Sequence, residues 1–227
     1  MSHQPHSVIF TDLDHTLLDG RGTPGIAGPV IRMLAKRGIP VVPTTSKTAA
    51  EVAALMRTHL VHGPAVVENG VAICLPAFNN HWRTEHLTHW RYPRIRAVLH
   101  KLAHKLGVRF SGFGDWGLDE IARLTGLTRL QALNARRREA SEPIRADNPA
   151  PLLQALADHG LQGVQGGRFI SVQPQGVDKG SGARALLKAM RPVWGHPRVI
   201  ALGDAPNDIG LLNMADHAAC LPGPHPV

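Results

Sequence analysis

The chain of 227 residues contains only two cysteines, Cys74 and Cys220. Both stand in apolar surroundings without the spacing of a metal site, so we expect buried free thiols in a reducing compartment. The sequence also lacks any run of eighteen apolar residues, and residues 1–7 lack the apolar segment of a signal peptide. These absences predict a cytoplasmic protein without a membrane-spanning segment.

Acidic residues are outnumbered: 25 Lys and Arg stand against 17 Asp and Glu, a formal net charge of +8 with 14 His not counted. This balance favours an anionic partner such as a phosphorylated metabolite, nucleic acid or an acidic membrane face, although solubility alone also explains it. Aromatic residues make up only 4% of the chain, and no aromatic and basic platform for nucleic acid is evident. We therefore expect a small phosphorylated ligand and no nucleic acid.

The chain is organised around residues 8–19, VIFTDLDHTLLD. An apolar, β-prone run leads directly into Asp12 and Asp14, which predicts a buried strand with charge at its carboxyl end. In extended backbone, residues i and i+2 point to the same side, so both carboxylates can address one ligand. Carboxylates held this close repel each other, and a cation or a shared proton relieves the repulsion. The alternative is a strand that ends in an ordinary acidic turn.

Strand and helix signals alternate after this strand. The expected helices are residues 29–37 and 49–60, and the expected strands are residues 39–43 and 65–67. The step Asn69–Gly70 has apolar runs on both sides, which predicts a hairpin into residues 71–75. The β-α-β-α-β order predicts a parallel sheet with right-handed crossovers.

The alternation of strand and helix signals stops near residue 76 and resumes near residue 174. We therefore predict an α/β domain of residues 1–80 and 174–227, with residues 81–173 as an inserted α+β segment. The insert is expected to hold helices 95–106, 119–125, 129–140 and 149–159 and strands 108–113, 143–145, 163–165 and 169–172. Beyond it we expect a glycine-rich loop 174–182, helix 183–190, strand 199–202 and helix 209–214.

Polar residues gather at the ends of the predicted strands. They are Asp12, Asp14, Thr45, Ser46, Lys179, Asp204 and Asp208. In open α/β sheets, ligands bind at the carboxyl ends of the strands. Acidic oxygens without His or Cys suit Mg²⁺ better than Zn²⁺. A lysine and hydroxyls beside Mg²⁺ suit a phosphoryl group, and one carboxylate that attacks phosphorus would complete a covalent mechanism.

This arrangement resembles the haloacid dehalogenase (HAD) superfamily, whose four motifs occur here in order. They are Asp12-Leu-Asp14-His-Thr16, the hydroxyl after the second strand, Lys179, and Gly203-Asp204-Ala-Pro-Asn207-Asp208. The resemblance implies an α/β fold with a HAD-like Rossmannoid parallel-sheet core and an inserted α+β cap that determines substrate specificity.

Within the superfamily the chain resembles the mannosyl-3-phosphoglycerate phosphatase family, over nearly its whole length. The segments that carry this resemblance are TSKT at 45–48, VENG at 67–70, GFGD at 112–115, IARLTGL at 121–127, QGGRF at 165–169 and GDAPND at 203–208.

The resemblance assigns roles by motif. Asp12 is implied as the nucleophile and Asp14 as the acid and base. Thr45, with Ser46 as the alternative, and Lys179 are implied to hold the phosphoryl oxygens. Mg²⁺ is implied at Asp12, the backbone carbonyl of Asp14, and Asp204, with Asp208 supporting the metal shell and Asn207 orienting the loop.

Substrate selection is expected from the cap. A glyceric-acid carboxylate suits an arginine fork, and Arg168 is the candidate, with Lys47, Gln165, Arg145 and Asp115 behind it; an ordinary surface role is the alternative for each. One departure from the family is His15, where the first motif usually has glycine. The other is the short segment after the fourth motif, where residues 217–227 leave room for one edge strand.

The sequence thus predicts a Mg²⁺-dependent phosphatase of a small sugar acid, with mannosyl-3-phosphoglycerate as the expected substrate, mannosylglycerate as the product and an aspartyl-phosphate intermediate. The alternatives are a phosphatase of glucosyl-3-phosphoglycerate or sucrose phosphate, or a HAD phosphomutase. A non-enzymatic alternative is a basic nucleic-acid-binding module on an inactive HAD core. The oligomeric state is left open.

Overall fold

The computed structural model describes residues 4–19, 22–60, 62–166 and 168–222. The chain divides into two compact units, one of residues up to Leu87 together with those from Asp178 onward, and one of Thr88–Val177. None of the described helices is long and apolar enough to cross a membrane.

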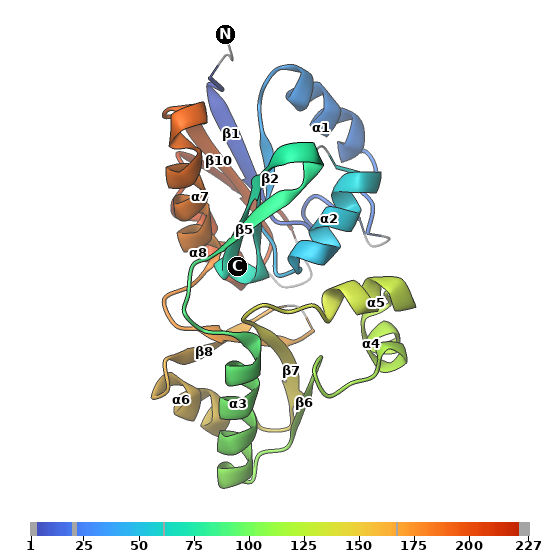
Figure 1. Cartoon of the computed structure of the whole chain (residues 1–227), viewed down its shortest axis with the longest axis vertical. Coiled ribbons are helices and arrows are strands. Elements are labelled where there is room, and N and C mark those ends of the chain that lie inside the picture. Colours follow the sequence, from blue (N-terminus) through green and yellow to red (C-terminus); the bar gives the residue numbers. More distant parts are fainter. Residues whose placement is uncertain (1–3, 20–21, 61, 167, 223–227) are drawn as a thin grey trace. The chain divides into compact units, whose positions relative to one another are not determined.

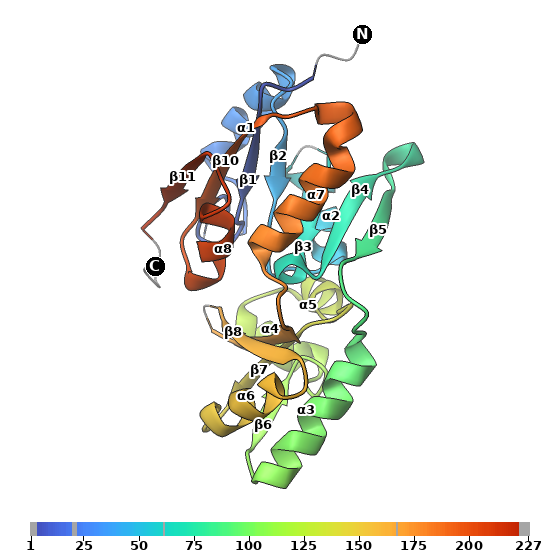
Figure 2. The same cartoon turned by 90° about the vertical axis from the view of Figure 1, so that its left-hand side faces the viewer.

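The first unit contains a four-stranded parallel sheet in the order β11-β10-β1-β2. Its strands are β1 (Ser7–Thr11), β2 (Val41–Pro43), β10 (Arg198–Gly203) and β11 (His217–Cys220). Its helices are α1 (Ala27–Lys36), α2 (Ala49–Thr58), α7 (Lys179–Trp194) and α8 (Ile209–Leu212). Figures 1 and 2 show α1 and α2 on one side of this sheet and α7 on the other. The predicted parallel α/β core is therefore confirmed.

Alternating side chains build the two cores of this unit. Val8, Phe10 and Val66 pack with residues of α7 and α8, whereas Ala65 and Val67 pack with residues of α2. Successive strand residues point to opposite faces, so the segment Ala65–Val67 contributes to both cores.

A second sheet of the first unit has the order β3-β4-β5 and is antiparallel. Its strands are β3 (Ala65–Val67), β4 (Ala72–Pro76) and β5 (Trp82–His86). The hairpin expected at Asn69–Gly70 is confirmed, and the turn is the short 3₁₀ element η1 (Glu68–Gly70). β3 meets the parallel sheet through one bridge, between Thr44 and Val66. A further 3₁₀ turn, η2 (Phe78–Asn80), connects β4 to β5.

The second unit holds an antiparallel sheet in the order β6-β7-β9-β8. Its strands are β6 (Phe110–Gly112), β7 (Glu142–Ala146), β8 (Leu161–Gln165) and β9 (Ile170–Pro174). Its helices are α3 (Tyr92–Leu106), α4 (Leu118–Thr125), α5 (Arg129–Ala135) and α6 (Ala150–Ala157). This unit is an α+β unit, as the sequence predicts for residues 81–173.

Several details differ from what the sequence predicts. Residues 82–86, placed in the insert with a boundary at 80, form β5 and pair with β4, and the other division lies at 177/178 instead of 174. Helix α7 begins at Lys179, within the expected loop 174–182, because Asp178 caps it through the backbone N–H of Ser181. Cys220, expected to be buried, is exposed because it lies on the edge strand β11, whereas Cys74 is buried.

Candidate active site

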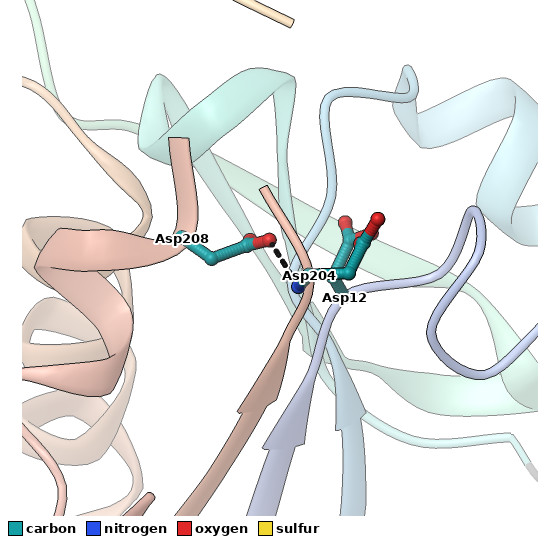
Figure 3. A group of neighbouring side chains, drawn as sticks. All are labelled: Asp12, Asp204 and Asp208. Atoms are coloured by element: carbon teal, nitrogen blue, oxygen red, sulfur yellow. Dashed lines mark hydrogen bonds between the residues drawn. The ribbon is translucent and has the colours of Figure 1, made fainter. Parts of the chain in front are cut away.

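Three carboxylates meet at the carboxyl ends of β1 and β10 (Figure 3). Asp12 follows β1, Asp204 follows β10, and Asp208 closes the 3₁₀ turn η3 (Pro206–Asp208). One oxygen from each lies within 4.8 Å of the others, and all three residues are buried. The parallel register, in which Thr11 pairs with Leu202, brings the two strand ends level. The sequence predicted this convergence from strand ends alone.

Lys179 lies at the centre of this acidic group. Its Nζ donates to Asp12 Oδ1 at 2.6 Å and to Asp208 Oδ1 at 2.5 Å, and its side chain is 1% exposed. Burial lowers the pKa of Lys179, but the charges of Asp12 and Asp208 outweigh it and the net shift is upward. The lysine is therefore held as an ammonium ion beside Asp12.

Burial is also the main influence on Asp12. It raises the pKa of this carboxyl from 3.8 to about 6, since the opposing attraction of Lys179 is offset in part by the negative charge of Asp208. Three ionised carboxylates and one ammonium would leave two net negative charges in a buried site. A proton or a cation is needed there.

The donors fit a hard cation such as Mg²⁺, because they are carboxylate oxygens with no thiolate or imidazole among them. Asp208 has other partners as well: its Oδ2 accepts from the backbone N–H groups of Asp204 (3.0 Å) and Ala205 (3.1 Å). Asp208 therefore holds the loop that presents Asp204. Asp12 and Asp204 are the residues best placed to bind a cation.

Asp14, the fourth predicted acid, lies apart from this group. Its Oδ2 pairs with Lys47 Nζ at 2.7 Å, and its side chain is 48% exposed. Burial lowers the pKa of Lys47, but the charges of Asp14 and Glu51 raise it above its ordinary value. Thr16, just beyond Asp14, donates its hydroxyl to Asp204 Oδ1 at 2.8 Å. The loop after β1 thus joins the acidic group through Thr16.

His15 occupies the turn after Asp14 with a φ of +63°. This left-handed conformation suits glycine better than residues with a Cβ. This backbone explains why the resemblance leads us to expect glycine at this position. His15 adopts the same conformation at a cost.

Thr45 and Ser46 follow β2, the neighbour of β1 in the sheet. Thr45 is buried, and its Oγ1 accepts from the backbone N–H of Lys47 at 3.2 Å. Lys47 was expected to contact substrate, and in this structure its ammonium group lies on Asp14. The loop is continued by α2, which Thr48 and Glu51 cap reciprocally. Thr45, Ser46 and Lys47 thus share the sheet edge with Asp12.

Two of the predicted cap contacts, Gln165 and Arg168, lie in the second unit, with Gln165 at the end of β8 and Arg168 just before β9, whereas Lys47 lies in the first unit. Arg168 is exposed, and its Nη1 donates to the carbonyl oxygens of Leu124 (3.2 Å) and Thr125 (3.3 Å) at the end of α4. Gln165 donates to the neighbouring carbonyl of Gly166.

The two lesser candidates of the cap also have partners. The guanidinium of Arg145 lies over the ring of Phe169, at 5.0 Å. Asp115 pairs with Arg96, which in turn binds the buried Glu142. These contacts make Asp115 part of an internal network of the second unit.

Sequence reasoning missed one contact of the site. Asn207, expected to orient the loop, donates from Nδ2 to Asn69 Oδ1 at 3.3 Å. The signal at Asn69 was the Asn-Gly step, which predicted a hairpin turn and gave no indication of the partner.

This fold and this acidic sheet edge define a haloacid dehalogenase-like hydrolase. The family model for haloacid dehalogenase-like hydrolases matches residues 154–222. Among solved structures, protein 0175 of Thermoplasma acidophilum aligns with a TM-score of 0.71 at 19% identity, over 96% of this chain and 85% of that one. A HAD phosphatase from Bacteroides thetaiotaomicron aligns with a TM-score of 0.67 at 16% identity, over 95% and 90%. These likenesses show the fold.

Curated relatives are closer in sequence. A glucosyl-3-phosphoglycerate/mannosyl-3-phosphoglycerate phosphatase from Methanococcoides burtonii is 32% identical over 92% of this chain and 82% of its own length. Its counterpart from Persephonella marina is 34% identical over 95% of this chain and 84% of its own length. The chain therefore belongs to the glucosyl-3-phosphoglycerate/mannosyl-3-phosphoglycerate phosphatase family, a family of phosphoric monoester hydrolases.

Proposed function

We propose that this protein is a Mg²⁺-dependent phosphatase that hydrolyses a glycosyl-3-phosphoglycerate, with mannosyl-3-phosphoglycerate as the expected substrate and mannosylglycerate as the product. The observation that carries the proposal is the position of Asp12: its carboxylate ends a buried strand, 2.6 Å from the ammonium of Lys179 and beside Asp204. A carboxylate so placed can attack a phosphoryl group whose charge its neighbours neutralise.

Mg²⁺ would be held by Asp12 and Asp204, with the backbone carbonyl of Asp14 as the implied third protein ligand and Asp208 in support. When bound, it would shield the negative charges of the carboxylates and the phosphate from each other. The raised pKa of Asp12, about 6, supports the assignment, because a group that is costly to ionise without a cation is one that a cation stabilises.

In the first step, an Asp12 oxygen forms a bond to phosphorus while the bond from phosphorus to the glycerate oxygen breaks. Asp14 donates a proton to that oxygen, which leaves as a hydroxyl. In the second step, water attacks the phosphorus of the aspartyl-phosphate and Asp14 takes a proton from it. Inorganic phosphate leaves, and the Asp12 carboxylate is restored.

Thr45, Ser46 and Lys179 are proposed to bind the phosphoryl oxygens. The hydroxyls lie in the loop after β2, the neighbour of β1 in the sheet, and Lys179 lies at the first turn of α7, so donors from two different elements reach the phosphoryl group. This arrangement holds the reacting group in line with Asp12, which is the main source of acceleration in phosphoryl transfer.

The glycosyl-3-phosphoglycerate specificity is proposed from the relatives, which are named for both the glucosyl and the mannosyl compounds. Arg168 and Gln165 remain the candidate substrate contacts of the second unit, and Arg168 is the one whose guanidinium suits the glycerate carboxylate. Lys47 stays a candidate substrate contact, and it lies in the first unit, where its ammonium group pairs with Asp14. We also propose a cytoplasmic location, from the composition.

The test is phosphorus NMR of full-length protein mixed with mannosyl- or glucosyl-3-phosphoglycerate, with Mg²⁺ and with chelator. The proposal predicts chelator-sensitive conversion of the monoester signal into inorganic phosphate. A monoester that rearranges without free phosphate would identify a phosphomutase instead. No turnover, together with steeply salt-dependent binding of DNA or RNA, would favour the non-enzymatic alternative.

A further inference from the structure

Residues Glu68, Asn69 and Gly70, which form the turn η1, have left-handed backbone conformations. Their φ angles are +48°, +55° and +94°, and all three residues are buried. Glycine adopts this region freely and asparagine tolerates it, whereas Glu68 has a side chain that disfavours it and persists there because the surrounding structure enforces it. Buried strain of this kind is found at functional sites, which directs attention to what this turn contacts.

The backbone of the turn holds the loop that carries Thr45. The N–H of Asn69 donates to the carbonyl of Thr45 at 2.9 Å, and the N–H of Glu68 donates to the carbonyl of Lys47 at 2.9 Å. Thr45 belongs to the proposed phosphate site, and Lys47 pairs with Asp14, the proposed acid and base. Two successive N–H groups can reach these two carbonyls because the turn is left-handed, which points consecutive amides to one side.

The side chain of Asn69 reaches a second loop of the site. It is 3% exposed, and its Oδ1 accepts from Asn207 Nδ2 at 3.3 Å. Asn207 lies in η3, between Asp204 and Asp208. One residue therefore connects the loop after β2, through its backbone, to the loop after β10, through its carboxamide.

The turn also packs on the helix that carries Lys179. A Cβ on Gly70 would overlap the carbonyl oxygen of Asp178, and a Cβ on Gly182 would lie 2.7 Å from the Cα of Gly70. Close approach of the two backbones therefore depends on glycine at both positions. The first turn of α7 is thus set against η1.

We propose that the turn Glu68–Asn69–Gly70 sets the mutual positions of the loops that carry Thr45, Lys179 and Asp204, and that Asn69 is a positioning residue for the phosphatase reaction. This inference rests on the proposed function. Asn69 does not touch the reacting atoms; it acts through Thr45 and Asn207. Small displacements of catalytic groups reduce turnover strongly, so the tie between the loops acts on kcat.

The substitution Asn69→Gly separates the two roles of this residue. Glycine adopts the left-handed backbone without steric strain but removes the carboxamide. Asn79→Gly is a matched control, because Asn79 is exposed, has a φ of +58°, and lies in η2 at the other end of β4. Asn207→Ala and the Asn69→Gly/Asn207→Ala double variant complete a mutant cycle.

We expect Asn69→Gly and Asn207→Ala each to lower kcat about tenfold or more, with a smaller change in KM. The double variant should be no slower than the slower single variant, and Asn79→Gly should match the wild type. Backbone amide hydrogen exchange at residues 45–48 and 204–208 should be faster in Asn69→Gly than in the wild type. In Asn79→Gly it should be unchanged.

The proposal is overturned if Asn69→Gly keeps wild-type kcat, if the two single effects multiply, or if exchange in both loops is unchanged. Failure of the proposed function has a different signature: the wild type itself then releases no phosphate from glycosyl-3-phosphoglycerates. In that case the exchange comparison alone decides whether Asn69 ties the loops together.

Discussion

Replacing Asp12 with asparagine should abolish turnover and, in the absence of metal, make the protein more stable. Asparagine has nearly the shape of aspartate but cannot attack phosphorus, so the aspartyl-phosphate cannot form. It also removes a carboxylate that is buried and costly to ionise. Loss of activity together with a gain in stability is expected only of a residue whose charge is held in place for function.

The size of the gain follows from the pKa of Asp12. In the folded protein this pKa is about 6, against 3.8 ordinarily, so ionising Asp12 at pH 8 costs roughly 3 kcal/mol. Between these two values the folded state binds more protons than the unfolded state, so the wild type loses stability as the pH rises. The advantage of Asp12→Asn should therefore be about 3 kcal/mol at pH 8 and about half of that at pH 5.

Thermal unfolding in chelator at pH 5 and pH 8 measures this difference. At pH 8 the gain corresponds to about 6 to 12 °C in Tm for a chain of this size. Asp14→Asn is the matched control: Asp14 is half exposed and paired with Lys47, so its replacement should give no such gain. An Asp12→Asn variant that is less stable than the wild type at pH 8, or equally shifted at both pH values, would refute the reasoning.

Three further changes test other parts of the site. Lys179→Met should cost about 3 to 5 kcal/mol of stability, seen in urea unfolding, because it leaves buried carboxylates without their ammonium partner; an unchanged midpoint would contradict the buried ion pairs. Lys47→Met should lower kcat at least about tenfold while the free energy of unfolding changes by less than about 1 kcal/mol, because its partner Asp14 is half exposed; wild-type kcat would remove Lys47 from the site. His15→Gly should raise stability by up to about 1 kcal/mol in thermal unfolding, since glycine suits a φ of +63°; a clear loss would show that His15 makes contacts that outweigh its backbone cost.

The cluster of Asp12, Asp204 and Asp208 could be predicted from the sequence because it depends on local pattern and topology. The apolar run before Asp12 and the one before Asp204 each predict a buried strand, and parallel strands place such ends at one edge. Asp14 shows where this reasoning stops. That Asp12 and Asp14 address one ligand, as their i+2 spacing predicts, stays a prediction. The pairing of Asp14 with Lys47, a residue from another loop, is encoded by no local pattern.

The start of α7 differs from the predicted one for a related reason. The sequence predicts that Gly180 and Gly182 lie in a loop, but both lie within the helix, where side chains would collide with Gly210 and with Gly70. Glycine serves close packing there, and packing partners are not visible in one segment. The buried role of Asn69 was hidden in the same way, because an Asn-Gly step predicts only the turn.

The measurement that tests the central claim most directly is kcat/KM for mannosyl- and glucosyl-3-phosphoglycerate beside 3-phosphoglycerate and a simple hexose phosphate, with Mg²⁺ and with chelator. We predict that one or both glycosyl-3-phosphoglycerates exceed the two simpler esters by about a hundredfold or more, because binding of sugar and glycerate together stabilises the transition state, and that chelator abolishes the rate. Equal or better turnover of the simpler esters, or a rate that survives chelation, would contradict the account.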